Sequence, residues 1–187
     1  GGWNERLSDQ IFKILYDSKD TATAVRLILE IVGRYYGVSR AYIFENSPDD
    51  SACSNTYEWC AEGVSPAKDS LQDIPYSTVG DYPANFNEEG VFYCGDIHAL
   101  PPGLYELLAP QGISSMLQCA ILDDGRFKGY VGFDECAAAR LWTKEEIDTL
   151  TLVAQIVGIF LLKQRAQDKL AAAYERQRSV MDSMDNW

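Results

Sequence analysis

The sequence predicts an α+β fold, with one mainly antiparallel sheet of about five to six strands and helices gathered on one face. The predicted elements run in the order helix, helix, two strands, long loop, strand, short helix, two strands and long helix. A parallel sheet needs a crossover connection, usually a helix, between successive strands. This chain has too few such helices, so an antiparallel sheet is favoured.

Two amphipathic helices are predicted before the first strand. Residues 8–17 place apolar side chains on one side, and Ser8 stands where a helix cap is expected. Residues 22–36 repeat apolar side chains at helical spacing, and Gly37 is a suitable C-terminal stop. Both helices would bury one side against the sheet.

Five strands are predicted from apolar runs bounded by turn-forming residues. They cover residues 38–45, 53–62, 91–96, 115–122 and 128–135, with a short helix over 104–109. Asp124 and Gly125 between the last two strands predict a tight hairpin. The long segment 63–90 carries prolines and aromatic residues, which indicates a packed lid rather than a loose tether.

A long helix is predicted from residue 143 onwards. Thr143 and Glu146 have the spacing of a capping box, and Trp142 and Ile147 have that of a hydrophobic staple. The helix is apolar on one side at first and then becomes mostly polar. A helix that begins inside a domain and then leaves it can pass on a signal.

This helix also carries a weak heptad seam with several polar members. Such a seam suits a helix that is balanced between two registers. We expect a parallel homodimer through the N- and C-terminal helices; an exposed connector with a chance stripe is the alternative. The seam residues are Ile156, Phe160, Lys163, Gln167, Leu170, Tyr174, Gln177, Met181 and Met184.

Composition excludes several classes of function. The formal net charge of -12 over 187 residues argues against direct binding to nucleic acid or to anionic membranes. The longest apolar run, Ile156–Leu162, is too short to cross a bilayer. The five cysteines are scattered and form no C-x-x-C pair, so we expect free thiols in a reducing cytoplasm.

Several segments, in the right order, resemble the GAF domains of bacterial sensor proteins, especially multidomain histidine kinases and diguanylate cyclases. The resemblance covers about residues 20–165. It leaves residues 1–19 as an N-terminal helical extension and 166–187 as a signalling helix and linker, of which 178–187 is similar to the start of a PAS domain. The segments are Thr56–Pro66 (TYEWCAEGVSP), Leu71–Tyr76 (LQDIPY) and Gly129–Gly158.

The resemblance implies a cytoplasmic sensory module. In this family the terminal helices cover one face of the sheet, and loops around the third strand close a small-molecule pocket on the other. Family ligands include cyclic nucleotides, linear tetrapyrroles, haem, metal centres and small metabolites, and many members have no known ligand. We therefore expect a sensory domain without catalysis of its own, and we assign no cofactor.

The pocket is expected on the open side of the sheet, as an apolar cavity with a few placed polar groups. Phe133 and Asp134 should point to opposite faces, with Phe133 under the helices and Asp134 near the pocket. Trp59 and Met116 could equally fill a closed core. The candidate ligand-binding residues are Trp59, Tyr76, Phe86, Asp96, Met116, Gln118 and Asp134.

The signature of cyclic-nucleotide-binding members is incomplete here. That signature is N-K followed by F-x3-D-E. Lys128 is present without the matching asparagine, and Phe133 directly precedes Asp134 and Glu135. The pattern therefore does not predict a cyclic-nucleotide ligand.

The features of bilin-binding or metal-binding members are also partial. Asp73, Ile74 and Pro75 echo the Asp-Ile-Pro triplet of bilin-binding members, which also carry a Cys-His pair at the attachment site. His98 is the only histidine and lies away from Cys94. A single histidine in a polar loop is more often a surface residue than a metal ligand.

Three alternatives stay open. The first is a thiol enzyme that resembles free methionine-(R)-sulfoxide reductase, with Cys94 as nucleophile, although no neighbouring base lowers the pKa of this thiol. The second is a redox pair of Cys119 and Cys136, although the two lie near opposite ends of the predicted hairpin and small buried strand residues are the favoured interpretation. The third is a ligand-free dimerisation spacer with a filled core.

Overall fold

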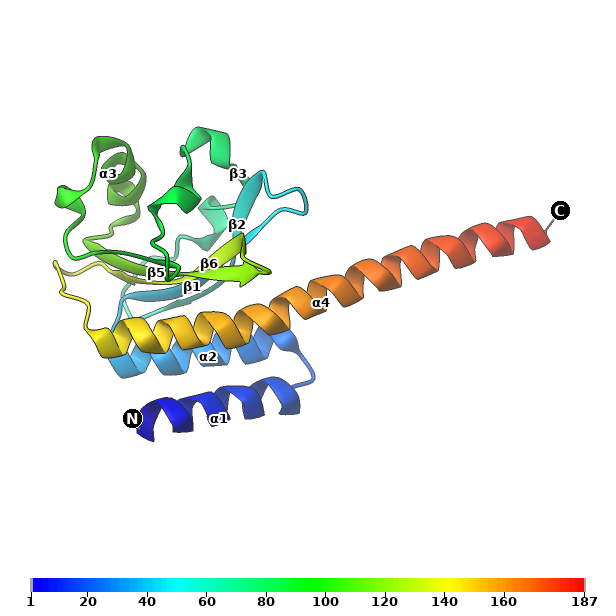
Figure 1. Ribbon diagram of the computed structural model, residues 1–187, viewed down its shortest axis with the longest axis horizontal. Helices are drawn as coiled ribbons and strands as arrows, with labels where there is room; N and C mark the ends of the chain where they lie inside the picture. The colour runs from blue at the N-terminus through cyan, green and yellow to red at the C-terminus, as the bar shows by residue number, and fades with distance from the viewer. Residues whose placement is uncertain (1, 187) are drawn as a thin grey trace.

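The computed structural model describes residues 2–186, with side chains for residues 5–186. Gly1 and Trp187, the ends of the predicted extension and linker, lie outside the described residues. The fold has helices on one face of a sheet and short helices and loops on the other (Figure 1). The helices beneath the sheet are α1 (Gly2–Asp17), α2 (Thr21–Tyr36) and α4 (Lys144–Asp185).

The sheet has six strands in the order β3-β2-β1-β6-β5-β4, and every neighbouring pair is antiparallel. This confirms the predicted α+β fold. The two-residue strand β3 lies inside the segment that was predicted as a loop. The strands are β1 (Arg40–Asn46), β2 (Ala52–Cys60), β3 (Ile74–Pro75), β4 (Val91–Cys94), β5 (Ser115–Asp123) and β6 (Arg126–Glu135).

The β5–β6 hairpin turns at Asp124 and Gly125, as the sequence predicts. Both residues have positive φ angles, 51° and 76°, which the tight turn between Asp123 and Arg126 requires. Asparagine, aspartate and glycine tolerate this left-handed backbone best. The turn fixes the register of the two central strands that carry the predicted pocket residues.

Strand β6 separates two cores. Val131 and Phe133 are fully buried on the helix side, whereas Tyr130 and Asp134 face the other side. The predicted opposite orientation of Phe133 and Asp134 is therefore confirmed. Gly132 lies between Tyr130 and Asp134, and a Cβ there would come within 2.5 Å of the Tyr42 ring. The missing side chain gives Tyr42 its place against the sheet.

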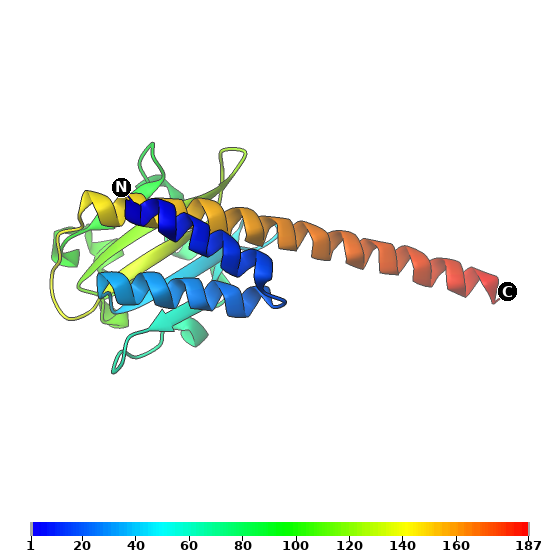
Figure 2. The same ribbon diagram turned by 90° about the horizontal axis from the view of Figure 1, so that it is seen from below.

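Helix α1 begins at Gly2, so Ser8 lies inside the helix and does not cap it. The predicted cap was wrong because the helical pattern extends further towards the N-terminus than its apolar stripe suggested. Leu7, Ile11 and Leu15 belong to the same buried cluster as α2, α4 and the sheet. Figure 2 shows α1 lying over the groove between α2 and α4.

The start of α4 is fixed by the predicted capping box. The Glu146 N–H donates to Thr143 Oγ1 at 3.2 Å, and the Thr143 N–H donates to Glu146 Oε1 at 2.8 Å. Arg140 adds ion pairs to Glu146 and Glu135 and donates to the Tyr36 carbonyl. The N-terminus of α4 is thereby tied to both β6 and α2.

Helix α4 has 42 residues and leaves the domain as a free rod (Figure 1). Leu161 is its last core residue, and residues 166–186 are all exposed. Over the described residues, no helix is long and apolar enough to cross a membrane.

We predict that Thr143→Ala lowers the free energy of unfolding by about 1 kcal/mol, because the first turn of α4 loses its side-chain acceptor. For a domain of this size that corresponds to a fall of about 2–4 °C in melting temperature, measured by calorimetry. Ser179→Ala removes an exposed hydroxyl from the same helix and serves as the control. Equal melting temperatures for the two variants would contradict the role of the cap.

Candidate functional site

A cavity opens on the face of the sheet away from the three long helices. The space that a water-sized molecule can enter is about 40 Å³, within about 570 Å³ of unfilled volume that includes the open mouth. Its walls come from β1, β2, β5 and β6, from the lid segment 63–90, and from α3 (Pro102–Leu108) with the turn that follows it. The lining residues are Tyr42, Phe44, Cys53, Asn55, Glu58, Ala67, Leu71, Ile74, Tyr76, Val79, Tyr82, Leu107, Leu108, Gln111, Ile113, Gln118, Tyr130 and Asp134.

Aromatic rings form much of the cavity floor and fasten the lid to it. Phe44 stacks on Tyr130 with ring centroids 4.8 Å apart, and Tyr82 of the lid stacks on Tyr130 at 5.5 Å. Phe86 packs edge-on against Tyr82 and Phe92. The lid is therefore packed against the sheet, as the sequence predicts.

A hydrogen-bond chain runs across the floor of the cavity. The Tyr82 hydroxyl donates to Gln118 Oε1 at 2.6 Å, and Gln118 Nε2 donates to Tyr42 Oη at 2.9 Å. Burial raises the pKa of both tyrosines, so both hydroxyls stay protonated at neutral pH. The chain fixes the orientation of the Gln118 amide.

A buried ion pair lies at one end of the cavity. Arg40 Nε donates to Asp134 Oδ2 at 3.1 Å, and both side chains are less than 5% exposed, at 3% and 4%. Arg40 also donates to the carbonyls of Ser65, at 2.9 Å, and Gln111, at 2.6 Å. Asp134 Oδ1 has no hydrogen-bond partner among the described residues.

Burial raises the pKa of Asp134 to about 6, although the positive charge of Arg40 opposes the rise. An aspartate in an unfolded chain titrates near about 3.9. The native state therefore holds this proton to higher pH than the unfolded state. The resulting contribution to stability is present below about pH 4 and is lost as the pH rises through about 6.

Three of the seven predicted pocket residues, Tyr76, Gln118 and Asp134, line the cavity. Met116 is fully buried on the same side of the sheet, and Phe86 packs there in the aromatic cluster, but neither lines the cavity. That the lining residues bind a ligand stays a prediction.

The predicted places of Trp59 and Asp96 were wrong. Trp59 lies on the helix-covered face, where the Arg34 guanidinium sits 5.6 Å from its ring. Strand alternation shows which residues share a face but not which face is open. Asp96 is an exposed cap that accepts from the His98 backbone at 3.0 Å and contacts His98 Nδ1 at 2.8 Å.

Arg40 and most of the aromatic residues of the cavity floor were not predicted from the sequence. Tyr42 and Phe44 alternate along β1 with Ala41 and Ile43, so both faces of the strand are apolar and the pattern alone does not separate them. The signal that could have identified them is the hydroxyl of Tyr42, because a buried tyrosine needs a hydrogen-bond partner.

Apart from Ile74, the residues of the partial bilin, metal and thiol features lie outside the cavity lining. Asp73 is exposed, with a φ angle of 50°, and of its triplet only Ile74 reaches the cavity. Burial raises the pKa of Cys94, and its Sγ lies 2.8 Å from the Asp96 carbonyl. Among the described residues, no group of three or more His, Cys, Asp or Glu side chains is placed to hold a metal ion.

A second hydrogen-bond path connects the cavity wall to α4. The Tyr76 hydroxyl donates to Asn46 Oδ1 at 2.6 Å, and the Arg165 guanidinium donates to the Asn46 carbonyl at 2.6 Å. Asn46 Nδ2 also donates to the Phe127 carbonyl at 3.0 Å. Asn46 is only 3% exposed and ends β1, so one buried residue contacts the lid, β6 and the exit helix.

Comparison with known proteins agrees with this architecture. A GAF domain model matches residues 20–161. The chain belongs to the GAF domain family. The methanogenesis regulatory histidine kinase FilI of Methanothrix harundinacea (strain 6Ac) is 33% identical over 150 residues, which are 78% of this chain and 17% of that kinase. This GAF chain therefore spans only a small part of its relative.

Solved GAF structures share the fold at low identity. A phycocyanobilin-bound GAF domain from a cyanobacterial phytochrome has a TM-score of 0.74 at 13% identity, covering 88% of this chain and 96% of that one. The blue-light absorbing form of the Thermosynechococcus elongatus PixJ GAF domain has a TM-score of 0.66 at 16% identity, with the same two coverages of 88% and 96%.

We predict that Arg40→Met lowers the free energy of unfolding by about 3–5 kcal/mol at about pH 7.5, because it leaves the Asp134 carboxylate buried without its partner. The loss should be smaller at about pH 5. Without Arg40 the pKa of Asp134 rises further, and the protonated carboxyl carries no buried charge. Urea unfolding at the two pH values measures both effects.

Arg34→Met is the matched control, because Arg34 is 68% exposed. This substitution should lower the free energy of unfolding only slightly at either pH. A loss for Arg40→Met that is the same at both pH values would show that the lost carbonyl contacts matter and the charge does not.

Proposed function

We propose that this GAF domain is a cytoplasmic sensory module of a longer signalling protein. It binds a small molecule in the cavity and transmits the binding through α4 to an output domain. The observation that carries the proposal is the path from Tyr76 through Asn46 to Arg165. The similarity to a regulatory histidine kinase, and the bilin-bound GAF neighbour, support a sensory role.

The path gives a physical route for the signal. A ligand that moves Tyr76 removes the hydroxyl that holds the Asn46 side chain, and Asn46 in turn holds Arg165 through its carbonyl. A hydrogen bond to a charged group contributes about 1.5–3 kcal/mol. Typical allosteric coupling free energies are about 1–3 kcal/mol. The free energy of this one hydrogen bond is therefore large enough to account for such coupling. The ligand must bind the two arrangements unequally to shift them.

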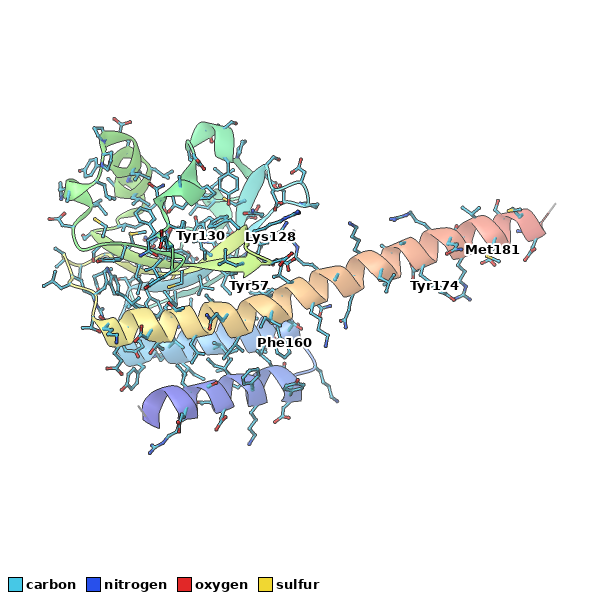
Figure 3. All side chains as sticks on the ribbon, in the orientation of Figure 1. Tyr57, Lys128, Tyr130, Phe160, Tyr174 and Met181 are labelled. Atoms are coloured by element: carbon cyan, nitrogen blue, oxygen red, sulfur yellow. The ribbon has the colours of Figure 1, made fainter. Side chains whose placement is uncertain are left out.

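We also propose a homodimer through the exposed part of α4. The first seam residues are used within the protomer: Ile156 is buried, and Phe160 packs edge-on against Tyr16 at 5.7 Å. Further along, Tyr174 and Met181 project from the free rod (Figure 3) and are 66% and 58% exposed. A second copy would therefore pair with the seam beyond the domain body.

A catalytic role for Cys94 is not favoured by its surroundings. A nucleophilic cysteine needs a lowered pKa and access to substrate. Burial raises the pKa of Cys94, and the residue is 8% exposed and outside the cavity lining. We therefore propose that the domain itself is non-catalytic.

We predict that Tyr76→Phe speeds amide hydrogen exchange several-fold in the part of α4 around Arg165, because Asn46 loses its lid partner. Arg165→Met should have at least the same effect, since it removes the contact on the helix side. Tyr93→Phe removes an exposed hydroxyl from β4 and is the control. Unchanged amide hydrogen exchange around Arg165 in both Tyr76→Phe and Arg165→Met would contradict the proposed route.

Native mass spectrometry of the purified domain, beside the same sample denatured, tests the small-molecule and dimer proposals together. We expect a bound small molecule as a mass difference that disappears on denaturation, and a dimer peak. Replacing Tyr174 and Met181 by Asp should give a monomer, because charges enter the apolar seam. Ala172→Asp, on the opposite side of the exposed helix, should leave the dimer intact.

A clean ligand-free dimer would favour the dimerisation spacer over the sensor. A dimer that survives the double aspartate substitution would place the interface elsewhere.

A further inference from the structure

The charged residues that line the cavity are all acidic. Its lining residues include two carboxylates, Glu58 and Asp134, and contain no lysine, arginine or histidine. Arg40 compensates Asp134 but is not itself a lining residue, and its guanidinium already donates to Asp134 and to the Ser65 and Gln111 carbonyls. A negatively charged ligand would therefore meet a carboxylate with no available cation beside it.

The two carboxylates are not equivalent. Glu58 accepts from the backbone N–H groups of Ala67, at 2.9 Å, and Lys68, at 3.4 Å, so both of its oxygens are used within the protein. Asp134 uses Oδ2 for Arg40, and the Tyr42 hydroxyl also interacts with this carboxylate, whereas Oδ1 is buried and makes no hydrogen bond of ordinary geometry among the described residues. The Asp134 side chain is only 4% exposed, and the residue lines the cavity.

A buried acceptor without a donor costs about 1–3 kcal/mol, and more when it is charged. A ligand that brings a donor to Asp134 Oδ1 recovers this free energy. The rest of the wall is largely apolar and aromatic, with Phe44, Tyr82 and Tyr130 among its lining residues, so an apolar ring can pack against it.

We infer that the cavity binds a flat, largely apolar molecule with a protonated amine or amidine, whose N–H donates to Asp134 Oδ1, and that it excludes carboxylates and phosphates. The inference rests on the proposed function, since it names the chemical class of ligand for the same cavity. It separates this GAF domain from members that hold anionic ligands.

Matched fragments test the inference on the purified domain. Benzamidine and benzylamine are compared with benzoate and with uncharged benzyl alcohol by ligand-observed NMR titration. We expect the two cations to bind at least about tenfold more tightly than benzoate or benzyl alcohol, as a hydrogen bond between charged groups implies. Asp134→Asn should remove most of this preference, and Glu58→Gln should retain it.

The wild-type protein supplies a second measurement that needs no variant. Benzamidine stays protonated throughout, so its affinity should fall several-fold as the pH drops from about 7.5 to about 5 and Asp134 takes up a proton. Benzyl alcohol should show no such fall. The other titratable groups around Asp134 are Arg40 and Tyr42 of β1, Glu58 of β2, Tyr82 of the lid, and Cys136 after β6. Glu58→Gln shows whether Glu58 contributes.

The outcomes separate the ligand class from the sensory role. Binding of benzoate or benzyl alcohol as tight as that of the cations, or a pH-independent affinity for benzamidine, would overturn the inferred ligand class and leave a small-molecule sensor. If none of the fragments binds at millimolar concentration, and native mass spectrometry shows no bound molecule, the small-molecule role fails as well.

Discussion

The cavity depends on the buried ion pair between Arg40 and Asp134. The two residues are directly paired across β1 and β6, and the same guanidinium reaches the Ser65 carbonyl on one side and the Gln111 carbonyl on the other. One side chain thus holds two loops against the centre of the sheet. The free energy needed to remove two charges from water offsets most of their mutual attraction. The pair therefore serves to position the two loops more than to stabilise the fold.

The sheet separates the cavity from the three long helices (Figure 1). On the helix side the core is almost entirely apolar, whereas the cavity side combines apolar residues with buried tyrosines, Gln118 and Asp134. A buried polar network works only when each member has a partner, and here one acceptor, Asp134 Oδ1, is left over. The two faces are joined at the end of β1 by Asn46, which contacts the lid through its side chain and α4 through its carbonyl.

Features set by neighbouring residues were predictable from the sequence. The capping box of Thr143 and the hairpin at Gly125 need only a few adjacent residues, and both were found. The face of the sheet on which Trp59 lies was not predictable. Alternation along a strand shows which residues share a face, but it does not show which face the helices cover. Arg40 and Asn46 were missed for another reason: each is polar at a strand end, where solvent is the usual expectation, and only tertiary contacts bury them.

Arg165 lies at the point where α4 leaves the domain, and this is the basis of the proposed route from the cavity to an output domain. Leu161 is the last core residue of α4, Arg165 is the last residue that the domain partly covers, and every described residue after it is exposed. From residue 166 the rod continues to Asp185, about 30 Å at 1.5 Å per residue. A contact at the point where a rigid rod leaves its support controls the angle of the whole rod. We therefore propose the Asn46–Arg165 hydrogen bond as the contact whose loss changes the direction of the rod, since a small change of angle there gives a large displacement at the far end.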